Sequence, residues 1–298
     1  MPSAIQTIDP AFHTLVDPDA RLQRVAAGFR FAGGPVFSRI GFLLFSDTGA
    51  RRIMKWTPAP GKTGPPGGRL TVFRRDSYGA HGLTFDHQGR LLACERAAGR
   101  VTRTEKDGKI TVLAEKFAGK LLNAPNGLIY AIDGSIYFSD LRDHSTPPDP
   151  SRTDFSAVYQ ITREGEVRVA TRRLERPKGV ALGRKQLTLY VADSGQQNIW
   201  RFHIRGDGSL SDAHVVARLE SDLTGGPAGL NTDEAGNLYV AGPGGVWVFS
   251  AAGRHLGTVV TPESASNCAW GAGFTGLYIT TRTSVYYVAT KVAGTRTF

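Results

Sequence analysis

Residues 123–140 read NAPNGLIYAIDGSIYFSD, and this stretch contains the unit from which the whole chain is built. Two short apolar segments rich in β-branched and aromatic residues flank Ile132-Asp133-Gly134, which is a typical tight-turn sequence. Asn126 stands before a glycine at the start of the first segment, and Asp140 ends the second segment 14 positions later (140−126). The stretch therefore predicts two antiparallel strands joined by a hairpin turn.

The same pattern occurs six times along the chain. A variable residue followed by a glycine or another small residue opens each unit, and a second strand ends 14 or 15 positions later (281−267, 193−178). The variable residues are Gly33, His81, Asn126, Lys178, Ala228 and Asn267. The matching strand ends are Asp47, Glu95, Asp140, Asp193, Gly242 and Thr281. Units that start 39 to 52 residues apart (267−228, 178−126), with four short strands each, are typical of a β-propeller.

We therefore predict an all-β fold: a six-bladed β-propeller with four antiparallel strands per blade, forming one domain over residues 1–298. The blades begin near residues 33, 81, 126, 178, 228 and 267. The sixth unit has no obvious fourth strand after its third, 285–288, whereas residues 22–26 form a strand that no unit claims. We expect this N-terminal strand to close the ring, which would remove an open sheet edge.

Composition limits the partners and the compartment. The chain carries a formal charge of +10, but its basic residues are dispersed in short pairs such as Arg51-Arg52, without interleaved aromatic residues, so we expect no nucleic-acid partner. No uncharged apolar stretch of about 18 to 20 residues is present, and the start lacks a secretory signal pattern, so we expect a cytoplasmic protein without a membrane partner. Cys94 and Cys268 lie in apolar segments and are expected to be free and buried.

Propeller geometry predicts where the variable residues lie. The first strand of each blade is innermost, so the residue that opens it lies beside the central channel, and all six lie at the same end. The second strand returns antiparallel, which brings the strand-end acids to that end as an outer ring. Asp47, Asp140 and Asp193 precede turns, and each is expected to cap the backbone amides of the turn that follows it. Glu95 departs from the aspartate pattern and is the acid we expect to have a functional role.

Several segments resemble the gluconolactonase and senescence-marker-protein (regucalcin) family of six-bladed propellers. They are 31–37 (FAGGPVF), 123–128 (NAPNGL), 154–159 (DFSAVY), 177–180 (PKGV) and 266–269 (SNCA), in order along the whole chain. The resemblance implies an enzyme that hydrolyses sugar lactones or related esters with one divalent cation at the channel mouth.

The resemblance fails at the family's metal ligands. The family's glutamate falls on Gly33, one asparagine on Lys178 and the aspartate on Ala228, so that only Asn126, a metal-proximal position, is retained. A hard cation requires six or more oxygen ligands, and both carboxylates are replaced. We expect no metal ligand set and no cofactor; Ca, Zn or Mg could bind only at a rebuilt site that uses the acidic ring.

The replacements suggest a different catalytic set: Lys178, His81 and Asn126. Lys178 could act as a base, form a Schiff base or polarise a carbonyl as a cation, or it could only form a salt bridge with Asp140 or Asp193. His81 suits proton transfer, although a lone histidine is often a hydrogen-bonded wall residue. Gly33 and Ala228 leave room for a bulkier ligand. We expect Asn267, Glu95, Asp193, Trp270 and Tyr78 to contact the substrate.

The sequence thus predicts a hydrolase of the lactonase or esterase type that acts on a lactone, ester or other carbonyl compound of small size, without the family's metal. Two alternatives remain open. The first is a metal-independent isomerase, lyase or cyclase on the same fold, and the second is a propeller that binds a small molecule without catalysis. The sequence indicates neither the substrate nor the oligomeric state.

Overall fold

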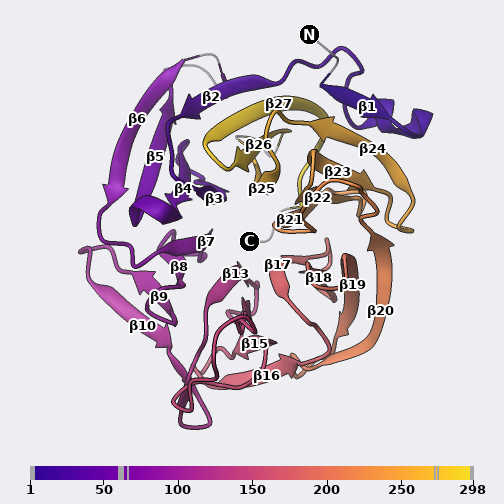
Figure 1. The fold of residues 1–298 in the computed structure, drawn as a ribbon. Coiled ribbons are helices and arrows are strands. Elements are labelled where there is room, and N and C mark those ends of the chain that lie inside the picture. The colour runs from indigo at the N-terminus through magenta and orange to yellow at the C-terminus, as the bar shows by residue number, and fades with distance from the viewer. Residues whose placement is uncertain (1–3, 60–63, 66, 272, 274, 296–298) are drawn as a thin grey trace.

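The computed structural model describes residues 4–59, 64–65, 67–271, 273 and 275–295 and confirms the predicted fold. Six antiparallel sheets surround a central channel, as Figure 1 shows. Blade one contains β3 (Ala32–Phe37), β4 (Leu43–Asp47), β5 (Arg52–Pro58) and β6 (Gly68–Arg74). Blade two contains β7 (Ala80–Phe85), β8 (Leu91–Glu95), β9 (Arg100–Thr104) and β10 (Ile110–Ala114). Blade three contains β13 (Pro125–Tyr130), β14 (Ile136–Asp140), β15 (Ala157–Ile161) and β16 (Val167–Thr171).

The remaining blades follow the same order from the channel outward, with one addition. Blade four contains β17 (Pro177–Leu182), β18 (Thr188–Asp193), β19 (Asn198–Ile204) and β20 (Leu210–Arg218). Blade five contains β21 (Leu230–Thr232), β22 (Leu238–Gly242), β23 (Gly245–Phe249) and β24 (His255–Val260), and β1 (Ile5–Thr7) adds a fifth strand outside β24. Blade six contains β25 (Ala265–Trp270), β26 (Thr275–Thr281) and β27 (Ser284–Ala293).

The N-terminal strand closes the ring, as predicted. β2 (Gln23–Ala27) pairs antiparallel with β27 and so becomes the fourth strand of blade six, with Gln23 opposite Tyr287 and Ala27 opposite Ser284. The short elements outside the blades are η1 (Pro10–Thr14), η2 (Thr48–Ala50), β11 (Lys116–Phe117) and β12 (Lys120–Leu121). No helix in the described part of the chain is long and apolar enough to cross a membrane.

The glycine after the variable residue has a packing reason in blades two, three and four. A Cβ atom on Gly82 would lie 2.4 Å from the backbone oxygen of Asn126, and one on Gly127 would lie 2.4 Å from that of Lys178. Gly179 stands in the same relation to Ala228, again at 2.4 Å. Neighbouring first strands thus pack backbone against backbone around the channel, and only glycine permits this approach.

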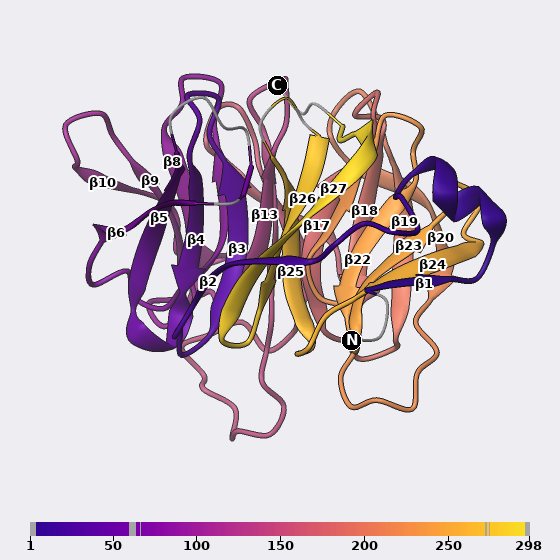
Figure 2. The same cartoon turned by 90° about the horizontal axis from the view of Figure 1, so that it is seen from above.

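Strand register places the variable residues and the strand-end acids at one end of the channel, which we call the mouth. Ala32 pairs with Asp47, Ala80 with Glu95 and Pro125 with Asp140. Two long connections, 141–156 and 219–229, extend from the ring on this side and are drawn in pink and orange in the lower part of Figure 2. At the opposite end, the hydroxyl groups of Thr295 and Thr232 are hydrogen-bonded at 2.8 Å, so the last described residues lie against the end of β21.

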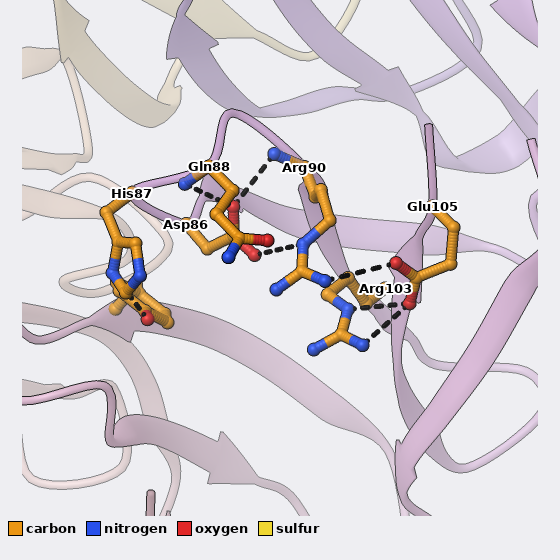
Figure 3. Close-up of polar contacts among 7 residues, drawn as sticks. Asp86, His87, Gln88, Arg90, Arg103 and Glu105 are labelled. Atoms are coloured by element: carbon orange, nitrogen blue, oxygen red, sulfur yellow. Dashed lines mark hydrogen bonds and ion pairs between the residues drawn. The ribbon is translucent and has the colours of Figure 1, made fainter. Parts of the chain in front are cut away.

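Polar side chains at the opposite end stabilise the hairpin turns. Figure 3 shows the turn between β7 and β8, where Asp86 accepts hydrogen bonds from the backbone of Gln88 and Arg90 at 3.0 and 2.9 Å. Arg90 also pairs with Asp86 and with Glu105, whose carboxylate in turn binds Arg103. These charges are paired with one another and therefore add little to the net positive charge.

Candidate active site at the channel mouth

The mouth is formed by residues that open the first strands of successive blades. His81 and Asn126 are 8% and 4% exposed, and Lys178 is half-buried. The backbone oxygen of His81 accepts a hydrogen bond from Ser46 of blade one at 2.9 Å, and that of Lys178 accepts one from Ser139 of blade three. The backbone of His81 and that of Lys178 are therefore each held by the preceding blade.

The ring of His81 occupies the space that Gly33 leaves. A Cβ atom on residue 33 would lie 3.2 Å from Nε2 of His81, and the ring centroid of Phe31 lies 6.0 Å from that of the imidazole. The expectation that Gly33 makes room for a bulkier ligand is therefore wrong, because the neighbouring blade fills that room. Glycine and histidine are complementary here, and a larger residue at position 33 would crowd the imidazole, which would have to shift by a few tenths of an ångström.

His81 is uncharged near neutral pH. Burial is the main cause that lowers its pKa from 6.5 to about 3, and the positive charges of Arg96 and Lys178 add to the effect. Its Nδ1 atom is buried and has no hydrogen-bond partner among the described residues. The imidazole thus retains an unused polar atom inside the wall of the mouth.

Lys178 has no ion-pair partner within the described residues. The alternative that it forms a salt bridge with Asp140 or Asp193 is not observed, because none of the ion pairs among the described residues includes Lys178. Burial lowers the pKa of Lys178, and the charges of Arg176 and Arg96 lower it further. The structure therefore rules out the interpretation that Lys178 serves only as a structural salt-bridge partner.

Arg96 and Arg176 were missed by the sequence analysis. Arg96 directly follows the last residue of β8, and Arg176 directly precedes β17. Burial lowers the pKa of Arg96, the nearby charge of Arg176 lowers it as well, and its Nε atom is buried without a hydrogen-bond partner among the described residues. Arg96 directly follows Glu95 and Arg176 lies two positions before Lys178, so their closeness to positions of the repeat was the available signal.

Three strand-end aspartates hold the loops that lead into the mouth. Asp47 accepts hydrogen bonds from the amides of Arg30 and Phe31 at 3.0 and 3.2 Å. Asp193 accepts them from Glu175 and Arg176, both at 2.8 Å. The expected capping of the following turn is found for Asp193, which also accepts a hydrogen bond from the amide of Gly195 at 3.0 Å, but not for Asp47. The main partners lie instead in the loop that precedes the blade, and Asp193 thereby fixes the backbone that carries Arg176.

Asp140 also binds a loop amide, but its carboxyl group has a different pKa. It accepts a hydrogen bond from the amide of Asn123 at 2.9 Å, while its second carboxylate oxygen, Oδ1, has no partner among the described residues. Burial raises the pKa of Asp140 to about 6.

Glu95 lies behind the mouth and is 1% exposed. Its carboxylate binds Arg74 of blade one, Arg100 of its own blade and the hydroxyl of Thr102. Both oxygens are thus used within the protein, which leaves no free acceptor for a ligand. A substrate contact for Glu95 or Asp193 stays a prediction that this geometry does not favour.

The structure brings the remaining predicted substrate contacts to different places. Tyr78 lies at the rim of the mouth and is 51% exposed, with Arg100 stacked over its ring at 4.8 Å. Asn267 is half-buried beside the channel, where its side chain accepts a hydrogen bond from the next backbone amide at 2.7 Å. Trp270 ends β25 toward the opposite end and donates a hydrogen bond to the backbone of Thr232 at 2.8 Å, so it does not join the mouth.

A cavity of about 120 Å³ lies along the channel below the mouth. It is lined by the inner strands, including Gly82, Gly127 and Gly179, and by Asn267 and Thr295. Cys268 also lines it, and both cysteines are free and buried, as expected.

The residues at the mouth do not fit a divalent cation. Gly33 and Ala228 offer no side-chain oxygen, and Lys178 would place a positive charge at a ligand position. Within the described residues, no three or more His, Cys, Asp or Glu side chains are grouped so that they could hold a metal ion. The acidic ring is therefore not arranged as a rebuilt metal site in this part of the chain.

Comparisons with known proteins agree with the propeller fold and identify relatives that are lactonases. A family profile described as the SMP-30/Gluconolactonase/LRE-like region matches residues 16–283. A gluconolactonase from Zymomonas mobilis is 26% identical over 309 aligned residues, covering 97% of this chain and 87% of the relative. The solved structure of a gluconolactonase from Xanthomonas campestris is 31% identical with a TM-score of 0.84, covering 96% of this chain and 94% of that one. A lactonase, drp35, from Staphylococcus saprophyticus is 26% identical over 231 residues, covering 61% of this chain and 69% of the relative.

Proposed function

Because the chain belongs to the SMP-30/gluconolactonase/LRE-like family, we propose that it is a hydrolase that opens a lactone or related ester at the channel mouth without a divalent cation. The substrate is a small molecule. The proposal is supported above all by Lys178, which stands at a ligand position of the family and has no carboxylate partner in the described chain. An unpaired ammonium at this point can do electrostatically what the family's cation does.

Lys178 stabilises the charge that develops on the carbonyl oxygen. When water attacks the carbonyl carbon, the oxygen becomes an oxyanion, and a fixed positive charge in a partly buried site lowers the energy of that state. Asn126, on the neighbouring blade, offers an amide that can hold the substrate in place. The expected contribution of one such stabilising group is roughly 3 to 4 kcal/mol of activation free energy.

In this proposal His81 acts as the general base and then as the general acid. As the water oxygen bonds to the carbonyl carbon, the neutral imidazole accepts the water proton; as the ring C–O bond breaks, the same proton passes to the departing alkoxide. The low pKa of His81 makes it a weak base in the resting site. The negative charge that forms beside it during the attack favours its protonation at that moment.

A divalent cation is disfavoured at the family's site. Two like unit charges about 4 Å apart repel each other by about 1 to 4 kcal/mol, for effective dielectric constants between those of water and of a protein surface. A doubly charged ion beside Lys178 would bear this cost without a carboxylate to offset it. Activity is therefore expected to persist in the presence of a chelator.

Substitution of Lys178 tests the proposal. We expect Lys178→Met to lower kcat/KM for lactone hydrolysis by at least a hundredfold, because the charge that stabilises the oxyanion is lost. The melting temperature should stay the same or rise, since an unpaired, partly buried charge is removed. The measurement is hydrolysis of a panel of lactones, esters and cyclic ketones with and without chelator, alongside a thermal melt.

Lys185→Met is the matched control, because this exposed lysine lies in the turn between β17 and β18 of the same blade, away from the mouth. Full activity of Lys178→Met would refute the proposed role. Activity abolished by chelator and restored by one metal would show a rebuilt metal site instead.

Amine chemistry is a second candidate, which the lowered pKa of Lys178 favours. A neutral lysine can condense with a carbonyl group to form an imine with loss of water, as a lyase or isomerase would require. Borohydride would reduce such an imine to a stable amine on Lys178, visible as a mass increase on that peptide. Hydrolysis as proposed leaves no adduct. Ligand-dependent stabilisation without any product would instead indicate a protein that only binds its ligand.

A further inference from the structure

Strand topology brings three cationic side chains to the mouth: Lys178 lies at the start of β17, Arg176 directly precedes that strand, and Arg96 directly follows the end of β8. The charges of Arg176 and Arg96 lower the pKa of Lys178, and the charge of Arg176 also lowers that of Arg96. Arg96 belongs to blade two and Arg176 to blade four. Their mutual influence therefore extends across blade three, at the start of β13 where Asn126 lies.

The protein provides little negative charge to balance this group. Among the described residues, no carboxylate lies within ion-pair distance of Arg96, Arg176 or Lys178. Asp143 is the acid whose charge acts on Arg96, and the charge of Arg176 acts on Asp143 in turn; this carboxylate is exposed, accepts hydrogen bonds from Ser145 and forms no ion pair with either arginine. Of the strand-end acids, Glu95 binds other arginines and Asp193 binds loop amides, whereas Asp140 has one carboxylate oxygen without a partner among the described residues, and burial raises its pKa to about 6.

Two buried nitrogen atoms in the same region also lack partners. Arg96 Nε and His81 Nδ1 have no hydrogen-bond partner within the described chain. Buried polar groups in native proteins are nearly always satisfied, and each exception calls for a specific explanation. Here the exceptions coincide with excess positive charge, which is the environment of an anion that binds from outside the chain.

We propose that the substrate is an anionic lactone or ester, whose carboxylate or phosphate group is held by Arg96 and Arg176 while its carbonyl group faces Lys178 and His81. Guanidinium groups match the paired oxygens of carboxylates and phosphates. The anionic group then lies over blade three, beside Asn126, between the two arginines. This inference rests on the proposed hydrolysis for the identity of the reaction but not for the binding of the anion.

Two lactones of equal size test the substrate class. The first is γ-carboxy-γ-butyrolactone and the second is its neutral γ-carboxamide. We expect kcat/KM for the carboxylate to exceed that for the carboxamide by at least tenfold, and the excess to shrink as ionic strength rises. Equal or faster hydrolysis of the carboxamide would overturn the inference and leave the proposed hydrolase function standing.

Substitution of the arginines locates the anion. Arg96→Gln and Arg176→Gln should each reduce the ratio of kcat/KM for the carboxylate to kcat/KM for the carboxamide by about tenfold, because each variant removes one of the two guanidinium groups that hold the anion. Arg163→Gln is the matched control, because this exposed arginine lies in the turn after β15 at the opposite end of the channel. An unchanged preference in both mouth variants would overturn the inference.

Binding without turnover separates the two proposals. The hydroxy-dicarboxylate that forms when the carboxylated lactone opens is titrated calorimetrically into the wild type and the variants. If neither lactone is hydrolysed, the proposed function fails, and arginine-dependent binding of the dicarboxylate still supports the anion site. Competition by acetate or by inorganic phosphate identifies the preferred anionic group. Absence of binding by the dicarboxylate and by both competitors would overturn the inference.

Discussion

Gly33 and His81 are sterically complementary, because the absence of a side chain on residue 33 leaves room for the imidazole ring. The imidazole lies where a side chain on residue 33 would extend, so glycine at residue 33 and histidine at residue 81 fit together. Burial lowers the pKa of His81, and the charges of Arg96 and Lys178 lower it further. The chemistry of this histidine thus depends in part on a residue of another blade, Lys178.

The low pKa of His81 predicts how stability depends on pH. The unfolded chain binds a proton at His81 below about pH 6.5, whereas the folded protein does so only near the pKa of about 3. The neutral His81 therefore contributes to the free energy of unfolding above about pH 6.5, and this contribution is lost as the pH falls towards about 3. At about 1.4 kcal/mol per pH unit, the loss between about pH 6.5 and about pH 4 is roughly 3 kcal/mol.

His81→Gln should lack this loss, which urea unfolding across that pH range would measure. Asp140 acts in the opposite sense, because its raised pKa of about 6 adds stability as the pH falls through that value. It is present in both proteins, so the difference between them isolates His81. Parallel stability curves for the wild type and the variant would contradict the assignment of a neutral, buried imidazole.

At the scale of elements, the loops that enter the mouth and the strands that follow them are held by different means. Asp47, Asp140 and Asp193 bind loop amides two or three residues before the variable position of their own blade. The first strands, in contrast, are held against one another by backbone contact at glycines. Blade two departs from the loop rule, because Glu95 reaches past the amides to bind arginines.

Gly127→Ala tests the backbone contact between blades three and four. The added methyl group would lie 2.4 Å from the backbone oxygen of Lys178, so either β13 or β17 must shift. We expect a loss of about 1 to 3 kcal/mol in the free energy of unfolding, as is typical when a packed core receives an extra methyl group. The shift also moves Lys178, so kcat/KM should fall.

Gly206→Ala is the matched control, because a Cβ atom at Gly206 meets nothing within 4 Å. Chemical denaturation of the two variants provides the comparison, and equal stabilities would show that the inner strands tolerate separation.

The whole molecule depends on the closure of its ring. β2 lies far from β27 in sequence, and their pairing joins the two ends of the chain into blade six. Without β2, the edge of β27 would be open to solvent and to other chains, and propellers avoid such edges.

Removal of residues 1–27 should therefore abolish the cooperative thermal transition, because β1, η1 and β2 are lost together with the buried side chain of Phe12. Removal of residues 1–8 eliminates β1 alone and should leave a folded ring with a lower melting temperature. Calorimetry and circular dichroism of both truncated proteins would measure this. A cooperative, near-native melt of the longer truncation would show that blade six does not need its fourth strand.

Local sequence was sufficient for the fold and for the position of the site. The six-fold spacing of variable residues and strand ends follows from hairpin geometry, which is encoded within each unit and does not depend on the other blades. The same spacing placed His81, Asn126 and Lys178 at one mouth and left residues 22–26 to close the ring.

Only the tertiary structure decided how the blades share that mouth. Three features arise between blades: His81 occupies the space beside Gly33, Lys178 has no ion pair among the described residues, and the charge of Arg176 acts on Arg96. Such contacts join residues that are dozens of positions apart in the chain, and charge and burial act over distances in space. The repeat therefore determined where each residue stands, and the closed ring determined its neighbours and hence its chemistry.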